Sequence, residues 1–251
     1  MRPTVAIVGL GLVGGSLARA LTRAGYTVVG VDRAAALRRA RTAGAIAETA
    51  ASVEAAAARS DLLVLAAPPK ANRALLRRAV GASPRRLVIT DVSSVKRDIV
   101  AEAKRLRYPG FVGGHPLAGN EGSGFGASSA DLFRGCAWVL TPEGASPRAV
   151  AVVRGVARAV GARPATMTAA DHDRALAFLS HVPQIVAWAL LAAARDDAVA
   201  RRALALAGPG FRDMTRLASS PRPLWREILG QNRGDIKRAL AGLRRRLWLQ
   251  P

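Results

Sequence analysis

The sequence predicts an α/β fold in which a doubly wound, mostly parallel sheet is followed by an all-helical (all-α) carboxyl-terminal domain. Near the start, a short β-branched run leads into a glycine-rich turn and then into apolar residues at helical spacing. Further short apolar runs alternate with Ala/Arg-rich helical stretches, which is typical of a parallel sheet. After about residue 168 the β-branched runs end. We therefore expect two domains, residues 1–168 and residues 169–251.

Each predicted element rests on a local pattern. The first strand is expected at residues 5–9, and the helix after it follows from apolar residues at positions 17 and 21. The other strands are expected at residues 27–32, 61–66, 86–91, 111–114 and 136–141, with a last strand within residues 161–168. Residues 171–194 form one long apolar helical pattern, which opens the second domain.

The composition excludes several classes of protein. Half of the 251 residues are hydrophobic, which excludes intrinsic disorder. No apolar run approaches the roughly 20 uncharged residues that a membrane-spanning helix needs, so we expect no membrane association. The first residues show no apolar leader pattern, and we expect a cytoplasmic protein.

The formal charge of +21 raises nucleic-acid binding as an alternative. Nearly all of the excess is arginine, and it is spread along the whole chain. A nucleic-acid-binding protein would instead be expected to cluster Lys and Arg with interleaved aromatic residues, which make up only 4% of this sequence. We therefore interpret the charge as a solvated basic surface and expect no nucleic-acid partner.

Cys136 is the single cysteine, so no intramolecular disulfide can form. With one cysteine and three histidines, we expect no zinc site of the usual type and no bound metal. Cys136 stands in an apolar run, and we expect it to be a buried strand residue.

The glycine-rich turn predicts a dinucleotide site. Gly9 permits a tight turn, Gly11 lets the backbone approach a pyrophosphate, and Gly14 allows close packing of the helix, whose start offers N–H donors to phosphates. Asp32, at the end of the second strand, is expected to bind ribose hydroxyls and to favour NAD over NADP, although Arg33 could serve a phosphate. The expected cofactor-binding residues here are Gly9, Gly11, Leu12, Val13, Gly14, Asp32 and Arg33.

Two further motifs follow neighbouring strands. Residues 91–96 read Asp-Val-Ser-Ser-Val-Lys, and residues 113–124 place His115 between glycines and a proline. Both motifs lie at carboxyl ends of strands, where open α/β sheets bind ligands. We expect His115 to lie in a loop and to accept a proton from a substrate hydroxyl while a hydride leaves the same carbon. Ser93 is assigned to the cofactor.

In the helical domain, Ser180, His181 and Gln184 interrupt an apolar helix together with Pro183. Proline inside a helix removes a backbone hydrogen bond, which favours a functional reason for this turn. The alternative is that Ser180 and His181 only satisfy each other or nearby carbonyl groups.

Arg212 and Arg216 lie about one helical turn apart, with Asp213 between them. One arginine could form a structural ion pair and leave the other for a carboxylate substrate. We assign Arg216 to the substrate and Arg212 to the ion pair.

Five motifs, in order along the chain, closely resemble the prephenate dehydrogenase family, which includes arogenate dehydrogenase. They occupy residues 9–17, 91–96, 114–124, 179–183 and 210–225. The resemblance implies a Rossmann-type first domain, NAD as cofactor and the oxidative decarboxylation of prephenate to 4-hydroxyphenylpyruvate in tyrosine biosynthesis. It also implies a homodimer formed through the helical domain.

The same resemblance assigns roles to single residues. His115 takes the hydroxyl proton, and Ser94 bonds near the hydroxyl and helps to set the histidine. Arg216 holds a substrate carboxylate, for which a planar guanidinium is well suited. The expected substrate-binding residues are Arg216, Ser180, His181, Gln184 and Glu121, the last as a pocket-gating acid.

Gln184 departs from the family pattern, in which many members have a second histidine there. A neutral amide both donates and accepts hydrogen bonds, so it excludes neither prephenate, with its keto acid side chain, nor arogenate, with its amino acid side chain. Both substrates therefore stay open.

The nearest alternative enzyme is a dehydrogenase of the β-hydroxyacid type, whose glycine turn looks similar. Those enzymes rely on a catalytic lysine in the helical domain. Here Lys237 is the only lysine after residue 104 and stands near the end of the chain, which disfavours this alternative.

Overall fold

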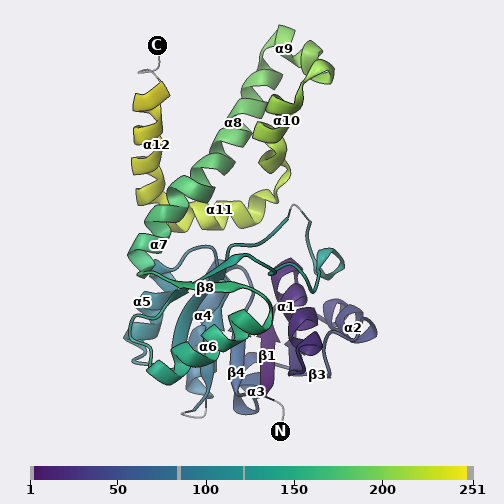
Figure 1. Cartoon of the computed structure of the whole chain (residues 1–251), viewed down its shortest axis with the longest axis vertical. Helices are drawn as coiled ribbons and strands as arrows, with labels where there is room; N and C mark the ends of the chain where they lie inside the picture. The colour runs from purple at the N-terminus through teal and green to yellow at the C-terminus, as the bar shows by residue number, and fades with distance from the viewer. Residues whose placement is uncertain (1–2, 84–85, 121, 248–251) are drawn as a thin grey trace. The chain divides into compact units, whose positions relative to one another are not determined.

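The computed structural model describes residues 3–83, 86–120 and 122–247 (Figure 1). The chain divides into two compact units, one that ends at His172 and one that begins at Asp173. In the described residues the first unit is α/β and the second contains only helices, so the predicted fold class is confirmed. The division falls inside a helix, a little after the expected boundary at residue 168.

The described part of the first unit has one eight-stranded sheet in the order β3-β2-β1-β4-β5-β6-β7-β8. Neighbouring strands are parallel except β6 and β7, which are antiparallel. The two-residue strand β3 lies in an alanine-rich stretch whose pattern gave no strand signal. The strands are β1 (Thr4–Val8), β2 (Thr27–Val31), β3 (Glu48–Thr49), β4 (Leu62–Leu65), β5 (Val88–Asp91), β6 (Phe111–Pro116), β7 (Ala137–Thr141) and β8 (Arg163–Thr166).

Helices cover both faces of this sheet. Val5 and Ile7 of β1 belong to one core cluster and Ala6 and Val8 to another, because successive strand residues point to opposite faces. Residues of α1, α2 and α6 pack in the first cluster, and those of α3, α4 and α5 in the second. These helices are α1 (Leu12–Arg23), α2 (Ala34–Thr42), α3 (Val53–Ala58), α4 (Pro69–Gly81), α5 (Arg97–Arg105) and α6 (Pro147–Ala159), with a short turn η1 (Phe125–Ala127) before β7.

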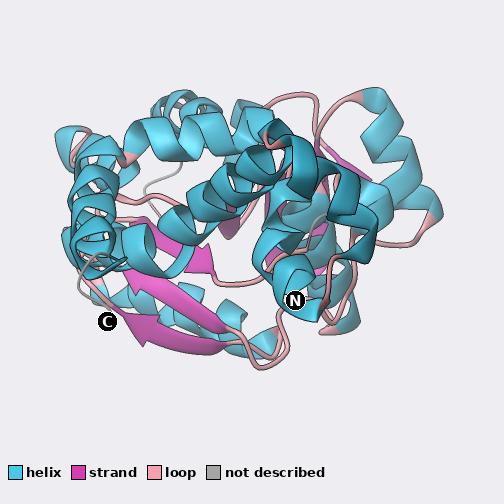
Figure 2. Cartoon of the chain, turned by 90° about the horizontal axis from the view of Figure 1, so that it is seen from above, coloured by secondary structure: helices cyan, strands magenta, loops and turns pink. Residues whose placement is uncertain are grey.

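The strands, magenta in Figure 2, all belong to the first unit, and the second unit is built from helices. A π-helical turn precedes Pro183, whose missing N–H cannot continue regular α-helical bonding. The helices are α7 (Ala169–Leu176), η2 (Ala177–His181), α8 (Val182–Asp196), α9 (Ala198–Ala203), η3 (Leu204–Leu206), α10 (Pro209–Thr215), η4 (Arg216–Ser219), α11 (Arg222–Gln231) and α12 (Arg233–Leu247).

Two sequence predictions about single residues were wrong. Cys136 is half-buried and lies just before β7 rather than inside it, although partial burial does raise the pKa of its thiol. His115 lies within β6 rather than in a loop. The glycines before it suggested a loop, but they are needed inside the sheet: a Cβ on Gly114 would stand 2.6 Å from the carbonyl oxygen of Asp91.

The expectation that no segment is long and apolar enough to cross a membrane was also wrong. The continuous helix over residues 169–196 meets that criterion by length and composition, with a mean hydropathy of 1.7 in its most apolar window. Helices that pack inside a soluble protein meet the same criterion, so this is weak support for a membrane span. Only 33% of that window is buried within the single chain, which leaves an apolar helix surface to be explained.

Candidate active site

In the turn between β1 and α1, two of the glycines are required by the close approach of neighbouring backbone atoms. Gly9 has a φ of +96°, and a Cβ on it would stand 2.6 Å from the carbonyl oxygen of Ala66. A Cβ on Gly14 would stand 1.9 Å from the carbonyl oxygen of Gly9. Larger residues at these two positions would therefore collide with backbone atoms.

Gly11 differs, because a Cβ on it would meet no described protein atom within 4 Å. It is the N-cap of α1 and makes no side-chain cap, so the N–H groups of the first turn, which includes Leu12 and Val13, point out of the helix without an intrahelical acceptor. Open space beside uncapped donors and a positive helix end is suited to a phosphate. The turn therefore fits the pyrophosphate of a dinucleotide.

Asp32 follows β2 and stands directly beside this turn. Its Oδ2 accepts a hydrogen bond from the backbone N–H of Leu10 at 2.6 Å, and its Oδ1 accepts one from the N–H of Arg33 at 2.6 Å. These bonds hold the carboxylate in place, and each oxygen keeps a further lone pair for a hydroxyl donor. Arg33 is exposed at the start of α2.

A buried ion pair connects β5 to β6. The Lys96 ammonium donates to Asp91 Oδ2, and both side chains are fully buried. The pair holds both backbone polar groups of Gly114: Lys96 Nζ donates to its carbonyl oxygen at 2.8 Å, and its N–H donates to Asp91 Oδ1 at 3.1 Å. The residue after Gly114 is His115, so this pair fixes the backbone that carries the histidine.

Asn72, which sequence analysis missed, extends this network toward β4. Its buried amide donates to the carbonyl oxygen of Leu65 at 3.2 Å and to Ser93 Oγ at 2.9 Å, and it accepts from the N–H of Ala67. Ser93 in turn donates its N–H to Asp91. The carboxyl ends of β4, β5 and β6 are thus joined by hydrogen bonds, with half-buried Ser94 on the same loop as Ser93.

His115 itself is almost fully buried, with an exposed fraction of 8%. Its Nδ1 lies 2.9 Å from Nε2 of His172, a buried residue of α7. Sequence analysis missed His172. The available signal was the polar run Asp-His-Asp-Arg at residues 171–174, which stands at the start of the long apolar helical pattern.

In the second unit, His181 is buried and its Nδ1 lies 3.1 Å from Asn232 Nδ2, which also donates to the carbonyl oxygen of Asp173. The His181 ring packs edge-on against Trp225. Ser180 is half-buried on the same turn. The structure thus brings Ser180 and His181 together in one π-helical turn, and Asn232 is a further polar partner that the sequence did not reveal.

Two polar side chains of α8 hold the segment that starts at Arg216. Gln184 donates to the carbonyl oxygen of Leu217 at 2.7 Å, and Trp188 donates to that of Ala218 at 3.1 Å. Gln184 is fully buried, and its Oε1 has no hydrogen-bond partner within the described part of the chain. Arg216 is exposed at the start of η4.

The predicted ion pair of Arg212 was wrong. Arg212 and Asp213 are both exposed, and the described residues contain no ion pair for either. Neighbouring positions on a helix diverge by about 100°, so adjacent charges do not face each other. Glu121 lies outside the described residues.

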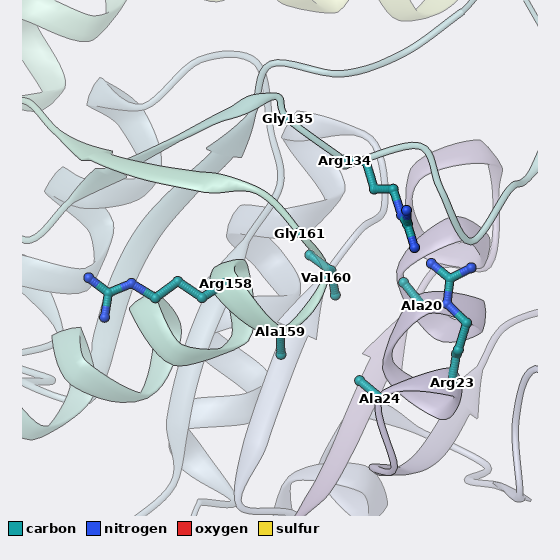
Figure 3. Close-up of a pocket in the computed structure, with 9 residues that line it drawn as sticks. All are labelled: Ala20, Arg23, Ala24, Arg134, Gly135, Arg158, Ala159, Val160 and Gly161. Atoms are coloured by element: carbon teal, nitrogen blue, oxygen red, sulfur yellow. The ribbon is translucent and has the colours of Figure 1, made fainter.

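The cavity shown in Figure 3 is not lined by any of the candidate site residues described above. It has a volume of about 530 Å³ and lies at the carboxyl-terminal end of α1, which is about 18 Å from the glycine turn at the other end of this 12-residue helix. Arg23 and Arg134 turn toward each other and share Asp131, whereas Arg158 extends away. Arg23 and Arg158 lie in the last turns of α1 and α6, where they match the negative end of the helix dipole, and Arg134 pairs with Asp131. These contacts account for the three arginines without a ligand.

Two family models match the chain in succession. The model described as the prephenate dehydrogenase nucleotide-binding domain matches residues 17–166, and the one described as the prephenate dehydrogenase dimerization domain matches residues 168–248. The chain belongs to the prephenate dehydrogenase family. The resemblance read from the five sequence motifs is thereby confirmed.

A curated family member from Bacillus subtilis, named prephenate dehydrogenase, is 32% identical in an alignment of 249 positions that covers 94% of this chain. The match spans about two thirds of that relative, 66% of its length. Among solved structures, the prephenate dehydrogenase of A. aeolicus in complex with hydroxyphenyl propionate and NAD+ is 30% identical, with a TM-score of 0.90 and coverage of 98% of this chain and 88% of that chain. Synechocystis arogenate dehydrogenase is 31% identical, with a TM-score of 0.84 and coverage of 97% and 89%.

Proposed function

We propose that this chain is an NAD-dependent dehydrogenase that converts prephenate to 4-hydroxyphenylpyruvate, carbon dioxide and NADH. The observation that carries the proposal is the buried imidazole of His115 at the carboxyl end of β6, on the sheet edge that also bears the glycine turn. Hydrogen bonds through Asn72, Ser93 and Asp91 join that edge. Family membership and the A. aeolicus complex support the same reaction.

In this proposal His115 is the proton acceptor. It takes the hydroxyl proton of the substrate ring while the hydride leaves the same carbon, and a neutral imidazole is the appropriate base near pH 7. The resulting dienone loses its ring carboxylate as carbon dioxide, because aromatisation stabilises the product. The proton then returns from His115 to the phenolate oxygen. Ser94 is proposed to bond the same hydroxyl and to orient it toward His115.

NAD, when bound, accepts the hydride. Gly9, Gly11 and Gly14 with the first turn of α1 would hold its pyrophosphate, since the open space at Gly11 and the uncapped donors fit that group. Asp32 would accept hydrogen bonds from the ribose hydroxyls and would repel a 2′-phosphate, which favours NAD over NADP.

The second unit is proposed to supply substrate-binding residues. Arg216 is assigned to a substrate carboxylate, for which a bidentate guanidinium is suited. The bonds from Gln184 and Trp188 support this role, because they fix the turn that begins at Arg216. Ser180 and His181 are proposed to contact the same substrate.

A specific observation favours arogenate as a second candidate substrate. One N–H of the Gln184 amide donates to the carbonyl oxygen of Leu217, and the buried Oε1 is an acceptor without a partner in the described residues. An acceptor is complementary to the ammonium group of an amino acid side chain and not to a keto group. If Gln184 faces the substrate side chain, arogenate is therefore also used.

We further propose a homodimer formed through the helical unit. Leu206 and Leu179 are 84% and 74% exposed in the single chain, and the long helix over residues 169–196 is only partly buried. A second subunit would cover such apolar side chains, as expected of an obligate interface. The dimerization-domain description of the matching family model supports this assembly.

The test is NADH formation by the purified protein with prephenate and with arogenate, each supplied with NAD and, separately, with NADP. We expect turnover of prephenate with NAD. Turnover of arogenate alone would replace the substrate in this proposal, and the absence of turnover with either substrate, in protein that binds NAD, would refute the proposed reaction.

A further inference from the structure

We propose that His172 is a positioning residue that fixes the tautomer of His115. In this arrangement Nδ1–H of His115 donates to Nε2 of His172, and Nε2 of His115 is the nitrogen that accepts the substrate proton. The inference rests on the proposed function in one respect, the assignment of His115 as the proton acceptor.

The geometry of the two rings is that of a direct hydrogen bond. The nitrogens are 2.9 Å apart, and the ring centroids are 5.1 Å apart with the planes inclined at 69°. His115 is 8% exposed and His172 is fully buried. A hydrogen bond between two buried imidazoles is made in low-dielectric surroundings, where it is stronger than in water.

Only one of the two possible directions of this bond is compatible with a base. If His172 donated, Nδ1 of neutral His115 would be the acceptor and its Nε2 would carry the ring proton, which would leave no nitrogen to take another. If His115 donates, its Nε2 holds the lone pair. His172 must then also carry its own proton on Nδ1, so both rings are Nδ1–H tautomers.

Several hydrogen bonds fix the start of α7 within the first unit, so the backbone that carries His172 is held in place. The N–H of Ala169 donates to both carboxylate oxygens of Glu143, at 3.1 and 3.0 Å, and Arg97 donates to the carbonyl oxygen of Ala170 at 3.0 Å. Thr168 caps the helix by accepting from the N–H of Asp171 at 3.0 Å. These bonds come from residues after β7 and from α5, so the ring of His172 is held relative to β6.

During the reaction His115 becomes an imidazolium, whose Nδ1–H is a stronger donor than that of the neutral ring. Nε2 of His172 accepts that bond and stabilises the charged form without adding a negative charge to the site. A neutral partner is consistent with a site that must also hold an anionic substrate. His172 therefore acts through His115 and does not itself touch the substrate.

The chain has three histidines, so the proposal can be tested by two-bond 1H–15N NMR of uniformly labelled protein, which distinguishes the two neutral tautomers. Resonances are assigned by single substitutions of each histidine. We expect His115 and His172 to be Nδ1–H tautomers in the wild-type protein near neutral pH. In H172L we expect His115 to shift mainly to the Nε2–H form. An Nε2–H tautomer for His115 in the wild-type protein would overturn the proposal.

Kinetics provide the second readout. We expect H172L to lower kcat about 100-fold, as for loss of a general-base contribution, with the KM for NAD changed less than twofold. H172Q retains a carbonyl acceptor for Nδ1–H and is expected to recover kcat to within tenfold of the wild type. Equal loss in both variants, or a full kcat in H172L, would overturn the positioning role. If the wild-type protein turns over neither substrate, the proposed function fails, and the tautomers still decide whether His172 orients His115.

Discussion

The two units of the chain hold their candidate functional residues in different ways. In the first unit these residues stand at ends of parallel strands, and a fully buried ion pair, Asp91–Lys96, holds the backbone before His115. In the second unit they stand on helices joined by single side-chain-to-backbone bonds, such as those from Gln184 and Trp188.

The hydrophobic cores of the two units differ in size. The first unit has two core clusters, one on each face of the sheet, each with many buried residues. The described core cluster of the second unit has four buried residues: Ala177, Val182, Ile236 and Ala239. The proposed dimer would account for this small core and for the exposed leucines beside it, because a second subunit would cover apolar side chains that the second unit leaves exposed in the single chain.

The largest effect is expected at His115. Substitution H115N removes the proposed proton acceptor and should lower kcat by about 10³-fold or more, since a positioned base contributes roughly 10² to 10⁴. NAD binding, measured by calorimetry, should be retained because the glycine turn is untouched. An H115N variant with wild-type turnover would remove His115 from the mechanism and break the contrast between the units.

The next effect concerns the stability of the first unit. Substitution K96M leaves the buried Asp91 carboxylate without its cation and should lower the free energy of unfolding by about 3–5 kcal/mol. The matched control is K104M, at an exposed lysine of α5, for which a change below about 0.5 kcal/mol is expected. Urea unfolding measures both, and equal stabilities of the two variants would show that the ion pair does not hold the site.

In the second unit, R216A should raise the KM for the substrate and lower kcat/KM by about 10²-fold, with little change in the KM for NAD. The control R212A removes an exposed arginine one turn earlier and should leave both constants within about twofold. Steady-state kinetics at varied substrate and fixed NAD gives the comparison. If R212A and R216A behave alike, the carboxylate assignment is wrong.

The next prediction tests whether the apolar side chains that the small core of the second unit leaves exposed lie in the proposed dimer interface. Substitution L206E places a charge on a side chain that is 84% exposed in the single chain and should weaken self-association at least about tenfold if that side chain lies in the interface. The control L117E changes an exposed leucine of the first unit and should leave assembly unchanged. Sedimentation is expected to show wild-type particles of about twice the 26.2 kDa chain mass. A monomeric wild-type protein would refute the assembly.

The smallest effect is a pH dependence of the first unit. Hydrogen bonds from Arg77 and then Arg105 lower the pKa of Glu102 from 4.5 to about 2. Because its folded-state pKa is depressed, Glu102 contributes stability above pH 4.5 that is lost as the pH falls toward 2. In the E102Q variant, the free energy of unfolding should therefore decrease less steeply than in the wild type as the pH falls from 4.5 toward 2. An unchanged slope would show that Glu102 is not paired in solution.

The sequence predicted local elements well and long-range partners poorly. Glycine spacing and β-branched runs are local signals, so the turn at Gly9 and the strand before Asp32 were found. Asn72 and His172 take their roles from residues 21 and 57 positions away, which no local pattern encodes. His115 was misplaced in a loop because the crowded sheet environment that requires Gly114 is a tertiary property.

In the helical unit, periodicity predicted the long helix but not its contacts. Spacing suggested an ion pair at Arg212, and the exposed positions of Arg212 and Asp213 do not form one. The support of the Arg216 turn by Trp188 depends on how α8 packs against η4, which the sequence pattern does not specify.

The most direct test of the proposed reaction uses prephenate that carries deuterium on the ring carbon bearing the hydroxyl, with wild-type protein and NAD. We expect the deuterium to appear on the reduced nicotinamide, one carbon dioxide to form per NADH, and a 4-hydroxyphenylpyruvate product without the label. Two results would contradict hydride transfer from that carbon, and with it the role of His115: reduced nicotinamide without deuterium, or a product that keeps both the label and the ring carboxylate.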